Sequence, residues 1–229
     1  MSKPPVPGTE QEASGASTPA GIVGRVETGR VEAFSDGVLA IVITLLVLDL
    51  HPPETHGRFA HELAHQWPAY LAYLASFAYA GVIWVNHHQL FTRIAVVDVG
   101  LLWRNLALLL ATSVLPFPTA VLGSAFQHGS RADQTAGIIL YCAVAAVMAC
   151  TWLTLFQYLC HHPDLHDPAT PEDFFEGERT RSTLGIASYV AAVALSLWQP
   201  LAALVLAAAL PIFYGITSNG WNRRRLQVR

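Results

Sequence analysis

Two histidines and a glutamate in the first third of the sequence have the spacing of a zinc-protease motif. His61, Glu62 and His65 match the pattern His-Glu-x-x-His, in which histidines one helical turn apart bind zinc and the glutamate acts as a base. No third metal ligand is evident beside them, and a chain with 10 histidines produces chance matches more readily. We therefore expect a solvated amphipathic turn, and keep a membrane metalloprotease only as an alternative.

A second group of side chains between positions 161 and 167 has the residue types of a divalent metal site or a pH sensor. Its members are His161, His162, Asp164, His166 and Asp167. Histidine titrates near neutral pH, which makes a sensor conceivable. Prolines surround the group, however, and prolines and polar residues are typical of a surface loop. We expect a solvated connection at this position.

Ionisable residues also lie within long apolar runs of the sequence. Asp36 is near the start of one run, and His87 and His88 are near the end of the next. Such residues mark ion and proton pathways in transporters, so a proton- or metal-coupled transporter is the alternative function. Inverted-repeat transporters have matched halves with broken helices. Here the obvious breaker pair, Pro116 and Pro118, has no counterpart, which weighs against a transporter.

Composition indicates that these residues belong to an integral membrane protein. Apolar residues make up 53% of the chain and charged residues 13%, whereas soluble domains have roughly 25% charged residues. The net charge of −3 and the lack of a basic stripe, apart from 223–225, exclude a nucleic-acid partner. Three cysteines, Cys142, Cys150 and Cys160, are odd in number and do not form a disulfide framework, and we interpret them as packing residues.

The uncharged runs predict an all-α, polytopic membrane protein with six transmembrane helices. Each run is long enough for a span of about 20 residues. The final run, 182–222, contains no charge and must cross twice, with a turn at Gln199-Pro200. We expect a disordered tail at 1–24, a six-helix channel domain at 25–222 and a basic end at 223–229. The expected helices are 30–50, 68–91, 100–122, 134–159 and two within 182–222.

The distribution of positive charge predicts how these helices are oriented in the cell membrane. With six spans, only Arg58 and Arg131 of the 13 Lys and Arg residues fall on the side opposite the termini. Lys and Arg concentrate on the cytoplasmic side of membrane proteins. We therefore expect both termini to be cytoplasmic.

The first expected helix has an apolar stripe and a carboxylate on different sides. Asp36 lies about 140° around a helical wheel from Ile41. Such a stripe alone indicates only helix packing, because most faces of a membrane helix are apolar. The carboxylate is more informative, since at membrane depth it needs a partner. The stripe consists of Phe34, Val38, Ile41, Leu45 and Leu48.

Three motifs in this region resemble those of one channel family. Residues 30–36 read RVEAFSD, similar to the RxxxFSD signature of the transmembrane protein 175 family of lysosomal and bacterial potassium channels. Residues 84–91 read WVNHHQLF, similar to that family's W-x-x-H-x-x-L-F pattern, with His87 at the histidine position. Residues 104–105 (Arg-Asn) and 115–119 (LPFPT) also look familial, and the resemblance covers roughly 30–220.

The resemblance implies a potassium-selective cation channel rather than an enzyme, with no cofactor and with K⁺ as the permeant ion. In that family the first helix of each subunit lines the pore, and bacterial members assemble as tetramers of one six-helix unit. The family lacks the TVGYG loop of ordinary potassium channels, as does this sequence. The carried-over constriction is a hydrophobic gate of Ile41, Leu45 and Leu48, with the Thr44 hydroxyl nearby.

The same resemblance gives the polar motif residues an anchoring role. Asp36 points away from the expected pore stripe, so we expect Ser35 and Asp36 to bond to neighbouring helices. Arg30 and Phe34 complete the motif. Such a network would fix the tilt of the first helix and hence the width of the constriction. The candidate partners at similar depth are Arg30, His87, Trp103, Arg104 and Asn105.

Overall fold

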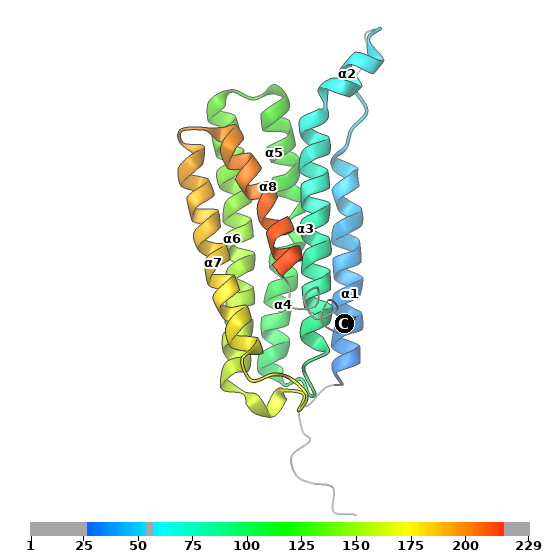
Figure 1. The fold of residues 1–229 in the computed structure, drawn as a ribbon. Coiled ribbons are helices and arrows are strands. Elements are labelled where there is room, and N and C mark those ends of the chain that lie inside the picture. Colours follow the sequence, from blue (N-terminus) through cyan, green and yellow to red (C-terminus); the bar gives the residue numbers. More distant parts are fainter. Residues whose placement is uncertain (1–26, 54–56, 218–229) are drawn as a thin grey trace, which may run out of the picture.

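A computed structural model describes residues 27–53 and 57–217, and within these ranges it contains helices and turns but no β-sheet (Figure 1). The expected tail at 1–24 and basic end at 223–229 lie outside the described residues. The elements in chain order are α1 (Thr28–Leu45), the 3-10 helix η1 (Leu46–Asp49), α2 (Phe59–His65), α3 (Trp67–Phe91), α4 (Val99–Ser113), α5 (Pro116–His128), α6 (Arg131–His161), the 3-10 helix η2 (Pro163–Leu165), α7 (Phe174–Ser196) and α8 (Pro200–Thr217).

The helices form the polytopic bundle that the sequence predicts. Among the described residues, four segments are long and apolar enough to cross a membrane: Thr28–Asp49, Trp67–Phe91, Val99–His128 and Arg131–His161. The helices α7 and α8 pack beside them, and α8 is apolar but shorter. Figure 1 shows that these helices run along a common direction and that α4 and α5 are stacked end to end. The all-α, membrane-spanning fold is therefore confirmed.

Prolines divide the chain where the sequence indicates breaks. Pro116 begins α5 after a two-residue interruption, and Pro200 begins α8 after α7 has ended at Ser196. Proline lacks an amide hydrogen and fits the first turn of a helix, where that hydrogen would have no intrahelical acceptor. The turn expected at Gln199-Pro200 is confirmed.

Helix α7 differs from the prediction because it begins eight residues before the uncharged run. It starts at Phe174 rather than near residue 182, and so it includes Glu178 and Arg181. Arg181 Nη1 lies 2.6 and 2.7 Å from the two carboxylate oxygens of Glu178. This internal ion pair lets a charged helical turn enter the bundle, which composition alone did not indicate.

The long helix α6 is at the centre of the packing, whereas α1 is at its edge. Helix α6 contacts α4, α5, α7 and α8, and fully buried Cys142, Ala145 and Met148 lie along it. Helix α1 packs mainly on α3 and α4, and one side of α1 is consequently left uncovered by its own subunit.

The three cysteines are free thiols. Cys142 is buried, while Cys150 is exposed.

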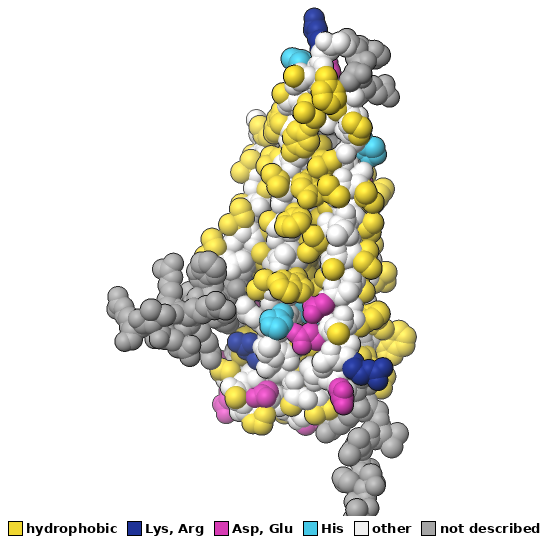
Figure 2. Space-filling model, turned by 90° about the vertical axis from the view of Figure 1, so that its right-hand side faces the viewer, with side chains coloured by type: hydrophobic (Ala, Val, Ile, Leu, Met, Phe, Trp, Pro, Cys, Tyr) yellow, Lys and Arg dark blue, Asp and Glu magenta, His cyan; other side chains and the backbone are white. Residues whose placement is uncertain are grey.

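The outer surface of the bundle is apolar over most of its height. Large side chains such as Trp103 and Leu110 are more than two-thirds exposed, at 68% and 69%. Figure 2 shows the face that carries α1 covered by hydrophobic side chains, with acidic and histidine side chains gathered lower on it. Apolar surface of this extent is stable against lipid or another protein but not against water.

Candidate functional site

Helix α1 has one face in the core and one face that its subunit leaves free. Leu39 and Val42 are each 1% exposed, whereas Ile41 is 59% and Leu48 is 66% exposed. Phe34 and Leu45 share this free side. Val38, the fifth residue of the predicted stripe, is partly buried and packs against the core. The other four residues of the stripe are therefore largely left free by packing within the subunit.

A row of small residues runs beside the large apolar ones on the free side of α1. Ala33, Gly37, Ala40 and Thr44 are all exposed and recur at helical spacing. A Cβ atom built on Gly37 would meet nothing within 4 Å. The subunit's own packing thus does not require small residues here. The Thr44 hydroxyl donates to the Ile41 carbonyl of its own helix at 2.8 Å.

A buried chain of hydrogen bonds ties the opposite side of α1 to α3 and α4. His87 Nε2 donates to Asn105 Oδ1 at 2.9 Å, because an amide oxygen can only accept. Asn105 Nδ2 donates to Ser35 Oγ at 2.9 Å, and Ser35 Oγ donates to the Val31 carbonyl at 2.9 Å. Ser35 and His87 are fully buried and Asn105 is 1% exposed. Asn105 of α4 therefore links α1 and α3 by hydrogen bonds.

His87 is held in a position that suits a structural role. Its ring stacks on Phe91, with ring centroids 4.4 Å apart. Its other nitrogen, Nδ1, is buried and has no hydrogen-bond partner among the described residues. A second proton would place an unsatisfied N–H at that atom, so the neutral imidazole fits this site. The proton-relay alternative gains no support from such a locked ring.

A second set of contacts joins α1 to α3 nearer the surface. Trp84 Nε1 donates to Asp36 Oδ1 at 2.9 Å, and His88 Nδ1 lies 2.6 Å from Glu32 Oε1. The sequence places Trp84 in a motif, but Asp36 was not predicted as its partner. The signal was present in the spacing, because Glu32 and Asp36 are four residues apart on one helix and Trp84 and His88 are four apart on the other.

Three of the expected partners of the first helix make no hydrogen bond to Ser35 or Asp36 in the described part of the chain. Trp103 is 68% exposed on the outside of α4. The Arg104 guanidinium lies 3.9 Å from the ring centre of Tyr158 on α6, and its Nη1 donates to the Gly100 carbonyl. Arg30 is exposed at the start of α1. The reason for the correction is rotational: Asn105 faces α1, so Arg104 is turned about 100° away from it.

Arg104 and Tyr158 belong to a separate contact at the start of α4. Asp98 accepts a hydrogen bond from the Leu101 amide at 2.8 Å and from the Tyr158 hydroxyl at 2.5 Å. Partial desolvation acts to raise the pKa of the Asp98 carboxyl, but the two hydrogen bonds outweigh it and the pKa lies below its ordinary value. Asp98 is thus an ionised N-cap that fastens α4 to α6.

The histidine-rich segments have structural explanations. His61, Glu62 and His65 lie on the exposed seven-residue helix α2. His161, His162 and His166 donate ring N–H groups to the carbonyls of Gln157, Tyr158 and Leu159, at 2.7, 2.8 and 2.9 Å. These carbonyls lie near the C-terminal end of α6, where carbonyls lose their partners within the helix, and the Leu159 carbonyl also accepts from the His162 amide at 3.0 Å. Within 27–53 and 57–217, no three His, Cys, Asp or Glu side chains form a metal-type group.

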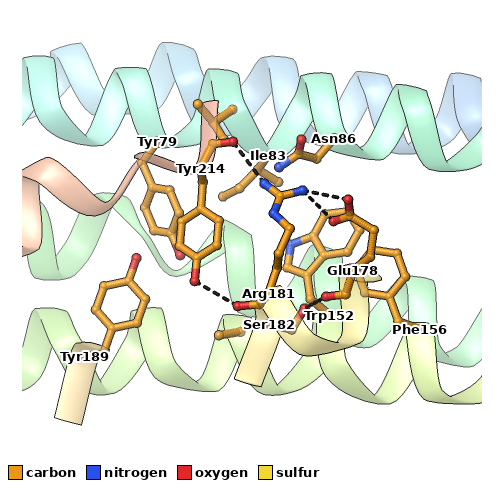
Figure 3. Close-up of a pocket in the computed structure, with 12 residues that line it drawn as sticks. Tyr79, Ile83, Asn86, Trp152, Phe156, Glu178, Arg181, Ser182, Tyr189 and Tyr214 are labelled. Carbon is orange, nitrogen blue, oxygen red and sulfur yellow. Dashed lines mark hydrogen bonds and ion pairs between the residues drawn. The ribbon is translucent and has the colours of Figure 1, made fainter. Parts of the chain in front are cut away.

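A cavity of about 60 Å³ lies between α3, α6, α7 and α8, away from α1 (Figure 3). The Glu178–Arg181 pair borders it, and Arg181 Nη2 donates to the Tyr214 carbonyl at 3.0 Å. The Tyr214 hydroxyl in turn donates to the Arg181 carbonyl at 3.2 Å. A space of this size accommodates about two water molecules but no organic ligand. We therefore assign these residues a structural role in the contact between α7 and α8.

These features define an all-α integral membrane protein whose edge helix presents a free apolar face. The family model for the endosomal/lysosomal potassium channel TMEM175 matches residues 30–116. A potassium channel of Streptomyces collinus is 39% identical over 191 residues, which cover 82% of this chain and 92% of that protein. A potassium channel of Chamaesiphon minutus is 37% identical over 204 residues, covering 84% and 96%.

A solved structure agrees with these relatives. The crystal structure of a lysosomal potassium-selective channel TMEM175 homolog from Chamaesiphon minutus matches with a TM-score of 0.73 and 32% identity, over 84% of this chain and 98% of that one. The chain belongs to the TMEM175 family, as its RVEAFSD motif indicates. The relatives named here are channels and not enzymes.

Proposed function

We propose that this protein is a potassium-selective channel in which several copies surround a pore lined by the free face of α1. The observation that carries the proposal is the exposure of Ile41, Leu45 and Leu48 on a membrane helix whose other face is anchored by buried hydrogen bonds. The names of the full-length relatives support potassium as the permeant ion. No resident cofactor is required for this activity.

The proposed assembly is a homotetramer embedded in the lipid bilayer. The small residues Ala33, Gly37 and Ala40 let a neighbouring subunit approach α1 closely, as small residues do between membrane helices. The channel domain is proposed to cover 25–222, between the tail at 1–24 and the basic end at 223–229. The skewed distribution of Lys and Arg supports cytoplasmic termini.

The proposed gate is a ring of branched apolar side chains at Ile41, Leu45 and Leu48. A narrow ring of this kind expels water and closes the path, and a small rotation of α1 widens it. Potassium gives up hydration water more readily than sodium, so a tight apolar neck favours potassium without carbonyl ligands. Asp36 bonds to Trp84, on the α3 side of α1, and therefore forms no charged ring in the pore.

The buried contacts of α1 supply the rigidity that such a gate needs. Ser35 is held through Asn105, and Asp36 and Glu32 are held from α3, all within about two turns of the helix. These hydrogen bonds on one side of α1 fix the tilt of the helix. Ile41, five residues beyond Asp36, then faces the pore. The width of the neck is thus set by polar contacts on the opposite side of the same helix.

Ion flux from liposomes tests this function. We expect purified protein to release K⁺ well above the rate of empty liposomes, and Na⁺ more slowly. His61→Ala is a suitable control, because His61 is exposed on α2 and its loss should leave the flux unchanged. Absence of K⁺ flux under several voltages would refute the channel. Slow, saturable K⁺ transport abolished by Asp36→Asn would instead favour the coupled transporter.

A further inference from the structure

Helix α2 leaves the bundle at an angle, directly beyond the end of the membrane-spanning helix α3. Pro68, the second residue of α3, has no amide hydrogen to donate to the Ala64 carbonyl, so the helical pattern is interrupted between them. The backbone of Gln66 has a ψ angle of 8°, well away from the α-helical value, and this turns the chain. Figure 1 shows α2 lying obliquely at the end of α3, beyond the ends of the other helices.

The two sides of α2 differ in residue type. Phe59 and Leu63 lie about 40° apart around the helix, and Trp67 follows at the same four-residue spacing. His61 and His65 occupy the opposite side. An apolar side opposite a polar side is the pattern of an amphipathic helix, which covers its apolar side with a partner.

The subunit itself does not cover the apolar side of α2. Phe59 is 50%, Leu63 is 41% and Trp67 is 52% exposed, and no residue of α2 is buried. The helix contacts α3, which directly follows it. A helix of seven residues is too short to be stable in water on its own. The apolar side is therefore free for a partner outside the subunit.

The position of α2 along the bundle indicates a lipid partner. Near the far end of α3, His88 pairs with Glu32 of α1, and this polar level marks one border of the hydrocarbon core. About 20 helical residues cross that core, and counting back from His88 they end at Pro68. The span of α1 and η1 ends at Asp49. Trp67 is thus at the level where headgroups meet acyl chains, the level at which tryptophan is enriched.

The size and continuity of the apolar side also favour lipid over a second copy of the chain. Stable protein interfaces bury roughly 1,200–2,000 Å² in total, of which three side chains supply only a small part. A bilayer needs no complementary shape. The stripe continues onto α3 with Leu71 and Leu74, which are 40% and 60% exposed. Exposed Arg58 precedes α2, and arginine near a membrane surface extends toward lipid phosphate.

We propose that α2 is an interfacial helix that binds the bilayer surface at its end of the bundle. Phe59, Leu63 and Trp67 insert between the lipid headgroups and the upper acyl chains, and His61 and His65 face water. Helices of this kind lie only about 5–10 Å deep in the headgroup and acyl boundary. This role concerns the membrane-spanning fold and does not depend on which ion the protein conducts.

Fluorescence quenching of single labelled cysteines in phosphatidylcholine nanodiscs tests the proposal without reference to conduction. Cys150 and Cys160 are replaced by alanine, and Cys142 is kept because it is buried; this protein alone gives the background. A bimane label is attached to Leu63→Cys or to His61→Cys. Both side chains are exposed, so both variants should elute like the wild type from a sizing column. The quenchers are iodide in solution and phosphatidylcholine with a nitroxide either at the headgroup or deep in the acyl chain.

The label at Leu63 should be quenched by the headgroup nitroxide at least about twofold more than the label at His61, and iodide should show the reverse order. The deep nitroxide should quench the Leu63 label less than the headgroup nitroxide does. Equal quenching by iodide at both positions would mean that α2 projects into water. A Leu63 label shielded from iodide and from both nitroxides would mean that a second copy covers it. Either result, or stronger quenching by the deep nitroxide, would overturn the interfacial helix.

Discussion

Replacing Ile41 with asparagine should raise K⁺ flux about tenfold and bring the K⁺ and Na⁺ rates close together. Ile41 is 59% exposed on the free face of α1 and forms no part of the buried core. In the proposed assembly, a ring of amides at this level would keep the neck hydrated and remove the dewetting barrier. A tenfold change corresponds to about 1.4 kcal/mol in that barrier. The flux is measured in liposomes with K⁺ and Na⁺ gradients.

Ile41→Val serves as the matched control for this change. Valine is apolar and branched like isoleucine, so the ring still excludes water and the flux should keep its preference for potassium. Both variants replace the same exposed side chain, and neither should unfold the subunit. Flux and selectivity of Ile41→Asn that equal the wild type would remove Ile41 from the gate.

Replacing Asn105 with leucine should lower the free energy of unfolding by about 1–3 kcal/mol. We also expect the K⁺ over Na⁺ selectivity of the flux to become poorly defined. Asn105 joins His87 to Ser35, and the change leaves the Nε2–H of a fully buried histidine without an acceptor. Hydrogen bonds between membrane helices contribute modestly one at a time, but this change breaks two and orphans a donor. The expected fall in the unfolding midpoint is roughly 3–10 °C, measured on protein in detergent.

Ser113→Ala is the comparison for the Asn105 variant. Ser113 lies at the end of the same helix, is exposed, and donates only to the Leu110 carbonyl of its own turn. Its removal should change stability by less than about 0.5 kcal/mol. If Asn105→Leu unfolds at the temperature of the Ser113 variant and of the wild type, the buried chain of hydrogen bonds does not hold α1.

The positions of the helices along the chain could be predicted from sequence, but their rotations about their own axes could not. Uncharged runs and prolines mark where helices begin and end, and the break at Gln199-Pro200 is an example. Depth in the membrane is also readable, and it placed Trp103, Arg104 and Asn105 together as candidates. Only the packed bundle shows that Asn105 alone of these faces Ser35.

The pairing of charged residues within the bundle also could not be predicted from the sequence. A rule that counts charges begins this membrane helix after Arg181. Glu178 pairs with that arginine about one turn away, however, and α7 begins before both residues, at Phe174. The histidines after α6 are a related case. Their residue types suggest metal binding, but His161 and His162 bond to carbonyls at the end of their own helix, which depends on side-chain rotamers that spacing does not reveal.

The free face of α1 as the lining of a potassium pore is the central claim, and silver ions test it most directly. In a background with Cys142, Cys150 and Cys160 replaced by alanine, single cysteines are placed at Ile41, Leu48 and Val42, the last being 1% exposed on the core side. Silver ions are small cations that bind thiols tightly. We predict that they stop K⁺ flux through Ile41→Cys and Leu48→Cys and leave Val42→Cys conducting. Conduction that persists through Ile41→Cys and Leu48→Cys, or block confined to Val42→Cys, would contradict a pore along this face.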